Sequence, residues 1–140
     1  MSSKILVGID GSPQGDKAFD FALNLARQSG ATVHCCAVVY GAEIEMAEAS
    51  EREALAERRR RRLQAHLQTL SERTRGQDPE PILHLLEGHP VEQLLELAER
   101  EQVNHIVVGH RSKGLFERLL MGSVAKRVVD FARCTVTVVR

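Results

Sequence analysis

The chain has 140 residues, 19 Lys and Arg against 19 Asp and Glu, and a hydrophobic fraction of 43%. This length predicts one domain, residues 1–140, with a core that needs neither a disulfide nor a metal. The formal net charge of +0 argues against a dedicated nucleic-acid binder and weakly favours self-association. Apolar runs fall far short of the roughly 20 residues that cross a bilayer, and no signal peptide is evident. We therefore expect a cytoplasmic protein without a membrane partner.

Hydrophobic residues alternate between short runs and helical spacing along the whole chain. The first strand is expected at Lys4–Ile9, and a helix from Ser12-Pro13 to Ser29-Gly30 follows it. Further strands are expected at 31–39, 82–86, 105–108 and 135–139, with a long helix from Glu43 to about Arg75 and two shorter ones beginning after Pro90 and near Val124.

Strict alternation of five strands with four helices predicts an α/β domain, an open parallel sheet with helices on both faces, similar to Rossmann-like folds. Ligands of such sheets bind outside the carboxyl ends of the strands, where the strand order reverses. The C-terminal strand, Thr135–Val139, is short and apolar. If it forms a sheet edge, its unpaired amides favour a homodimer through this strand.

Glycine and basic residues are concentrated between the fourth strand and the last helix. Gly109–Gly114 contains His110, Arg111, Ser112 and Lys113, and Gly122-Ser123-Val124 opens the helix. Glycines permit a close approach to a phosphate, and amides at a helix N-terminus attract anions. Ser123 is expected to cap this helix. The pattern predicts a phosphate site, although glycines that serve only as turn and cap residues are an equal alternative.

Two common nucleotide motifs are absent. A P-loop would require Lys-Ser/Thr directly after Gly114, where Leu115-Phe116 stands, and the first strand is not followed by GxGxxG. No metal-ligand spacing occurs among the six histidines. Cys35, Cys36 and Cys134 form no CxxC motif, so reduced thiols are expected. Neither a metal site nor a catalytic triad is indicated.

Five consecutive arginines, Arg58–Arg62, lie within the predicted long helix. Side chains of consecutive residues spread around a helix axis, and acidic residues precede the run. We interpret this run as a solvated or partner-facing surface rather than as a phosphate-backbone contact.

Three segments together resemble the universal stress protein family over essentially the full length. They are Lys4–Ser12 (KILVGIDGS), Glu87–Pro90 (EGHP) and Val107–Ala125 (VVGHRSKGLFERLLMGSVA). The ATP-binding members of this family are similar in carrying Gly-x2-Gly-x9-Gly-Ser/Thr, which falls on Gly109, Ser112, Gly122 and Ser123. Ser112 departs from the motif, which has glycine at this position. The Cβ atom of serine would oppose a positive φ there.

The resemblance implies a dimeric stress-response regulator that binds ATP, alone or with Mg²⁺, and acts on a regulatory protein partner. It assigns Asp10 to the adenosine side and Val38 to an adenine contact. From the residues alone, Asp10 is also explained as a turn residue and Val38 as a core valine. The residues expected to bind the nucleotide are Gly8, Asp10, Val38, Gly109, His110, Arg111, Ser112, Lys113, Gly114, Gly122, Ser123 and Val124.

Catalysis is not expected to be the main activity, although the resemblance allows slow ATP hydrolysis. A dedicated ATP-consuming enzyme of the related nucleotide-hydrolase type would carry a Ser-Gly-Gly loop after the first strand, which this chain lacks. The alternative function is a scaffold that binds no nucleotide and acts through protein contacts of the long helix. The departure at Ser112 favours this alternative.

Overall fold

The computed structural model describes residues 3–40, 42–110 and 121–140. In chain order the elements are β1 (Lys4–Ile9), α1 (Pro13–Ser29), β2 (Thr32–Val39), α2 (Ala42–Glu45), α3 (Ala49–Thr74), β3 (Ile82–Glu87), α4 (Pro90–Arg100), β4 (His105–Gly109), α5 (Ser123–Phe131) and β5 (Thr135–Val139). Within these described ranges, no helix combines the length and hydropathy that a bilayer crossing requires.

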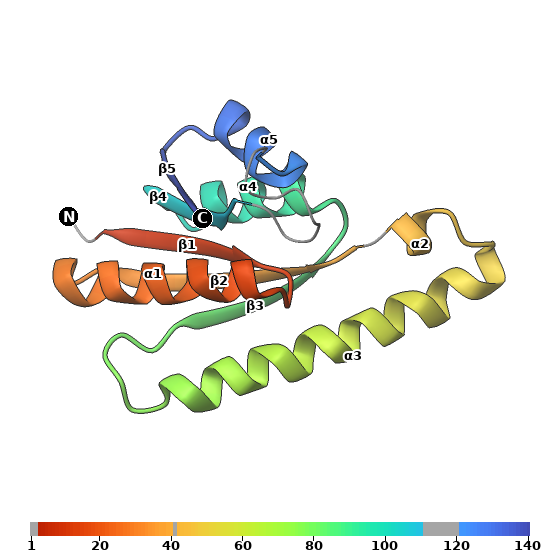
Figure 1. Cartoon of the computed structure of the whole chain (residues 1–140), viewed down its shortest axis with the longest axis horizontal. Helices are drawn as coiled ribbons and strands as arrows, with labels where there is room; N and C mark the ends of the chain where they lie inside the picture. Colours follow the sequence, from red (N-terminus) through yellow and green to blue (C-terminus); the bar gives the residue numbers. More distant parts are fainter. Residues whose placement is uncertain (1–2, 41, 111–120) are drawn as a thin grey trace.

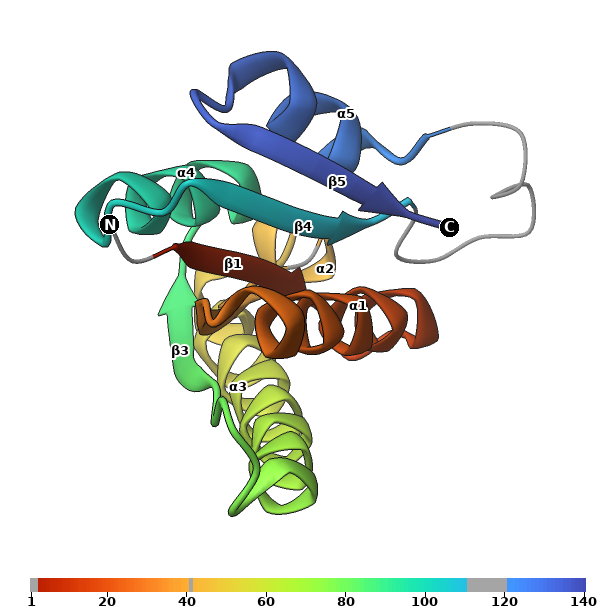
Figure 2. The same cartoon turned by 90° about the vertical axis from the view of Figure 1, so that its left-hand side faces the viewer.

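The strands form one parallel sheet in the order β3-β2-β1-β4-β5. β1 is central, and β3 and β5 are the edges (Figure 2). The chain adds β2 and β3 on one side of β1 and then crosses back to add β4 and β5 on the other side. The predicted open parallel α/β fold is therefore confirmed, and the strand order reverses between β1 and β4.

Local sequence signals fix the ends of α1. The Oγ of Ser12 accepts a hydrogen bond from the Gly15 amide at 3.2 Å, and Pro13 occupies the first turn, where its missing N–H costs nothing. At the other end Gly30 has φ 74°, a left-handed conformation that suits glycine. This helix therefore begins and ends where the sequence predicted.

The long helix differs from its prediction at the N-terminal end. The sequence placed its start at Glu43, whereas the structure has a short α2 and begins α3 at Ala49. Glu48 between them has ψ 152°, and its side chain makes no capping bond. Charged residues of good helix propensity run through this junction, so local sequence did not mark the break, which the chain needs to turn back beneath the sheet (Figure 1).

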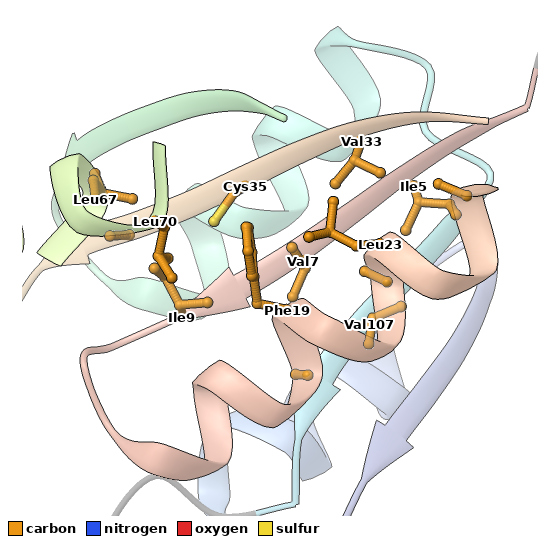
Figure 3. Packing of buried hydrophobic residues seen from close by; sticks show 14 of the residues in the cluster. Ile5, Val7, Ile9, Phe19, Leu23, Val33, Cys35, Leu67, Leu70 and Val107 are labelled. Carbon is orange, nitrogen blue, oxygen red and sulfur yellow. The ribbon is translucent and has the colours of Figure 1, made fainter. Parts of the chain in front are cut away.

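Two apolar clusters, one on each face of the sheet, form the core. α1 and α3 cover one face, with Leu63, Leu67 and Leu70 of α3 buried, and α4 and α5 cover the other. Cys35 belongs to the first cluster and Cys36 to the second, as alternation along a strand predicts. Figure 3 shows the first cluster around β1 and α1.

Replacing Phe19 should be far more costly than replacing its neighbour on the same helix, Phe21. Phe19 is 0% exposed and points from α1 toward the strands, whereas Phe21 is 41% exposed (Figure 3). We expect Phe19→Ala to lower the free energy of unfolding by about 3–5 kcal/mol, because it leaves a cavity in the core. Phe21→Ala should cost much less in the same urea denaturation. Equal losses would contradict the packing described here.

A pair of histidines bridges β2 and β3 on the face that α4 covers. The Nδ1 atom of His34 and the Nε2 atom of His84 are 3.0 Å apart, with the rings stacked. Burial lowers the pKa of both imidazoles from about 6.5. Nearby Glu101 opposes this shift, while Lys4 acts with burial on His34, and His34 and Arg100 act with it on His84.

The depressed pKa values predict a loss of stability in mild acid. Below about pH 6.5 the unfolded histidines take up protons that the folded pair still refuses, so the free energy of unfolding should decrease until the folded pKa values are passed. We expect His84→Gln to flatten this dependence in urea denaturations between about pH 7.5 and pH 5, a range that brackets the ordinary histidine pKa. His105, whose pKa burial also lowers, should retain part of the slope. An unchanged slope in the variant would contradict the assignment.

Candidate nucleotide-binding site

A cavity of about 330 Å³ opens at the carboxyl ends of β1, β2 and β4. We call it the first cavity. It lies where the strand order reverses, as expected for a parallel sheet. Its walls are Gly8, Ile9, Asp10, Ser12, Gly15, Cys36, Val38, Tyr40, Arg59, Pro90, Leu94, Val108, Gly109, His110, Gly122, Ser123, Val124 and Ala125. Of the predicted site residues, it brings together all that the structure describes: Gly8, Asp10, Val38, Gly109, His110, Gly122, Ser123 and Val124.

Asp10 directly follows β1 and lines the first cavity with an anchored carboxylate. Its Oδ1 atom accepts a hydrogen bond from the Ser12 amide at 2.9 Å. This contact is the turn bond that the sequence offered as the alternative explanation, so the turn role of Asp10 is real. The same residue also lines the cavity. An anchored carboxylate in such a wall can accept hydrogen bonds from hydroxyl groups.

The wall at the end of β2 is mainly apolar. Val38 is half-buried there and Cys36 is buried, and Leu94 of α4 joins them in the apolar cluster on the same face of the sheet. Burial raises the pKa of the Cys36 thiol to about 12, so this sulfur stays protonated and is a poor nucleophile at neutral pH. These side chains are suited to packing against a flat apolar group rather than to catalysis.

Tyr40 is a wall residue that the sequence analysis missed. Its hydroxyl donates to Glu45 of α2 at 3.1 Å, and its ring lies 5.5 Å from the His89 ring. It extends the β2 wall one residue beyond the strand. The signal for it was present, because it is the only tyrosine of the chain and directly follows a predicted strand at the ligand-binding end.

Gly109 ends β4 and packs against the first turn of α1. A Cβ atom at Gly109 would lie 3.1 Å from the Gln14 carbonyl oxygen, which is tighter than ordinary contact. The next residue, His110, is buried and holds two segments together. Its amide donates to the Val139 carbonyl at 2.6 Å, and its own carbonyl accepts from the Gly122 amide at 2.8 Å. The end of β4 and the start of α5 are thereby joined at the cavity.

The cap of α5 differs from the prediction. Gly122 is the N-cap, with no side-chain cap bond, and Ser123 is the first helical residue. The predicted capping role of Ser123 is therefore wrong, because the chain enters the helix one residue earlier than a serine cap requires. The first amides of a helix have no intrahelical acceptor, so this end offers donors and the positive end of the helix dipole to the cavity.

Arg59 corrects the interpretation of the arginine run as a solvated or partner-facing surface. Its side chain reaches from α3 to line the first cavity, and its Nε atom is buried without a hydrogen-bond partner among the described residues. Arg60 is also half-buried, and it pairs with Glu57 and with Glu87. Sequence could not separate Arg59 from its neighbours, because the choice depends on how α3 packs on the β2 and β3 side of the sheet.

Four of the predicted site residues lie outside the described residues: Arg111, Ser112, Lys113 and Gly114. Their predicted roles remain sequence-based predictions. Among the described residues, no group of three or more His, Cys, Asp or Glu side chains could hold a metal ion.

The chain matches the model of the Universal stress protein family over residues 1–140. A curated universal stress protein of Methanocaldococcus jannaschii is 30% identical over 138 residues, which cover 98% of this chain and 81% of the relative. Among solved structures, universal stress protein UspA from Lactobacillus plantarum superposes with a TM-score of 0.84 at 24% identity, covering 99% of this chain and 97% of the other.

Two further solved structures are described with a bound adenine nucleotide. A universal stress protein in complex with cAMP has a TM-score of 0.63 at 25% identity, covering 99% of this chain and 96% of the other. A universal stress protein family protein from Arabidopsis thaliana with AMP bound has a TM-score of 0.69 at 16% identity, covering 98% of this chain and 90% of the other.

Proposed function

This chain belongs to the universal stress protein family, and we propose that it binds an adenine nucleotide, ATP above all, in the first cavity. The observation that carries the proposal is the division of the cavity into three chemically different walls. They are the apolar β2 wall, the Asp10 carboxylate at β1, and the glycine and amide wall formed by the end of β4 and the start of α5. The solved relatives with bound cAMP and AMP support the same ligand class.

Each wall suits one part of the nucleotide. The adenine ring would lie on Val38 and Leu94, where burial of apolar surface is favourable. Ribose hydroxyls would donate to Asp10. The phosphates would meet Gly109, Gly122 and the α5 amides, which are suited to anions. Arg111 and Lys113, which the sequence predicts as site residues, would add cations at the phosphates. Mg²⁺ would bind to the phosphate oxygens of a triphosphate.

The proposed biological role is regulation in the cytoplasm. A ligand that binds only the folded state stabilises it, by about 2.7 kcal/mol at 100 times its Kd. Nucleotide occupancy would therefore alter the stability of the protein. We propose that it also alters the contacts of the protein with a regulatory partner. Slow hydrolysis is compatible with this role. The scaffold alternative, which rests on Ser112, requires the cavity to bind no nucleotide at all.

Asp10→Asn tests the proposed ribose contact. Asn keeps the side-chain oxygen that accepts from the Ser12 amide, but replaces the second carboxylate oxygen with a donor. We expect titration calorimetry to show ATP binding to the natural chain and about tenfold weaker binding to Asp10→Asn. Asp20→Asn is the matched control, since Asp20 is exposed on α1 and pairs with Arg73. A folded natural chain with no ATP heat would refute the proposal and favour the scaffold.

We also propose that the protein forms a homodimer through β5. Among the described strands this one is a sheet edge with β4 as its one neighbour, and exposed apolar side chains of α5, Val129 and Phe131, lie near it in the chain.

Sedimentation velocity at tens of micromolar should show a dimer. Thr135→Lys, at the first residue of β5, should shift it toward monomer, because charge on an edge strand opposes pairing. Ile82→Lys, at the first residue of the opposite edge β3, should leave the dimer intact. A monomeric natural chain, or equal effects of the two substitutions, would exclude this interface.

A further inference from the structure

A second cavity, of about 450 Å³, lies between the turn that follows β1 and one side of α3. Its walls are Asp10, Gly11, Ser12, Arg59, Arg62, Leu63, Ala65, His66 and Thr69. Asp10, Ser12 and Arg59 line both cavities, so the two adjoin at these residues. Neither the motifs nor the sequence resemblance pointed to this cavity.

The α3 wall of the second cavity is a stripe of hydrogen-bond donors. Arg59, Arg62, His66 and Thr69 are spaced three or four residues apart, which places them on one side of the helix. Buried Leu63 forms the floor beside them. The stripe faces the turn after β1, because both line the same cavity. It also contacts α1, where the Asp16 Oδ1 atom lies 2.7 Å from the His66 Nε2 atom.

Among the described residues in the walls of the second cavity, the two arginines of this stripe outnumber the one carboxylate, that of Asp10. The side chains of Arg59 and Arg62 form no ion pair or hydrogen bond with another residue that the structure describes, and the Arg59 Nε atom is buried as well. Arg60 and Arg61 on the same helix pair with Glu57. Like charges one turn apart repel, so an anion between Arg59 and Arg62 would relieve both the repulsion and the unsatisfied donor.

The position of Asp10 indicates how an anion in the second cavity would be connected to the nucleotide in the first. On the proposed function, ribose hydroxyls lie against Asp10, which stands in the shared wall. A group attached to one ribose hydroxyl would therefore extend past Asp10 into the second cavity, while the other hydroxyl still donates to the carboxylate. The 5′-phosphates leave the ribose on the opposite side, toward β4 and α5.

We propose that the second cavity binds a second phosphoryl group, carried on the 2′ or 3′ oxygen of the ribose of an adenine nucleotide in the first cavity. This inference rests on the proposed function. Arg59 and Arg62 would donate to the phosphate oxygens, with Thr69 and His66 completing the wall. The preferred ligands of the protein would then be adenosine bisphosphates and larger nucleotides that contain them.

Titration calorimetry with four probes tests the proposal: AMP, adenosine 2′,5′-bisphosphate, adenosine 3′,5′-bisphosphate and inorganic phosphate. We expect one bisphosphate to bind at least about tenfold more tightly than AMP, since hydrogen bonds between charged groups are strong. Added salt should reduce this gain. Arg62→Gln should abolish the gain and leave AMP affinity unchanged, because Arg62 lines only the second cavity. Arg58→Gln, exposed and outside both cavities, is the matched control and should keep the gain.

The possible failures are distinguishable. If the natural chain binds AMP but binds neither bisphosphate more tightly, the second cavity takes no ribose phosphate and only this inference fails. It also fails if Arg62→Gln weakens AMP as much as the bisphosphate, or if inorganic phosphate binds through Arg62 without any gain for the bisphosphates. If AMP, ATP and the bisphosphates all fail to bind, the proposed function falls, and this inference with it. Equal melting temperatures of the variants exclude unfolding as the cause.

Discussion

The chain leaves β1 and β4 toward opposite faces of the sheet, because it adds strands on one side of β1 before it crosses back to the other. After β1 the chain turns into α1 on one face of the sheet, and the segment after β4 leads to α5 on the other face. The first cavity is a consequence of this topology, and the residues around it determine what it binds.

Three neighbouring strands give the cavity three kinds of wall, because each contributes the residue at its own carboxyl end. Val38 of β2, Asp10 after β1 and Gly109 of β4 stand in the same order as the strands. A ligand with an apolar ring, hydroxyls and an anionic group in sequence matches that order. Asp10 also bounds the second cavity, which Arg59 and Arg62 of α3 line as well.

Local signals predicted the fold well and the site in part. Ser12-Pro13 and Gly30 marked the ends of α1, and apolar runs marked the strands, since these signals act over a few residues. Glycines of the β4–α5 segment marked the cavity for the same reason. Arg59 could not be chosen among five arginines, because only the placement of α3 against β2 and β3 selects it. The break at Glu48 and the identity of the α5 cap, Gly122 rather than Ser123, were missed, since tertiary geometry decides where α3 and α5 begin.

The most direct test of the account is the map of backbone amide shifts in a ¹⁵N-labelled protein during titration with ATP. If the cavity at the reversal of the strand order holds the nucleotide, the largest shifts should fall at three places: the end of β1 through Ser12, Val38 to Tyr40, and Gly109-His110 with Gly122 to Val124. Residues of the opposite sheet end, such as Ala31 and Asn104, should not move. Shifts centred elsewhere, or no shifts at saturating ATP, would contradict the account.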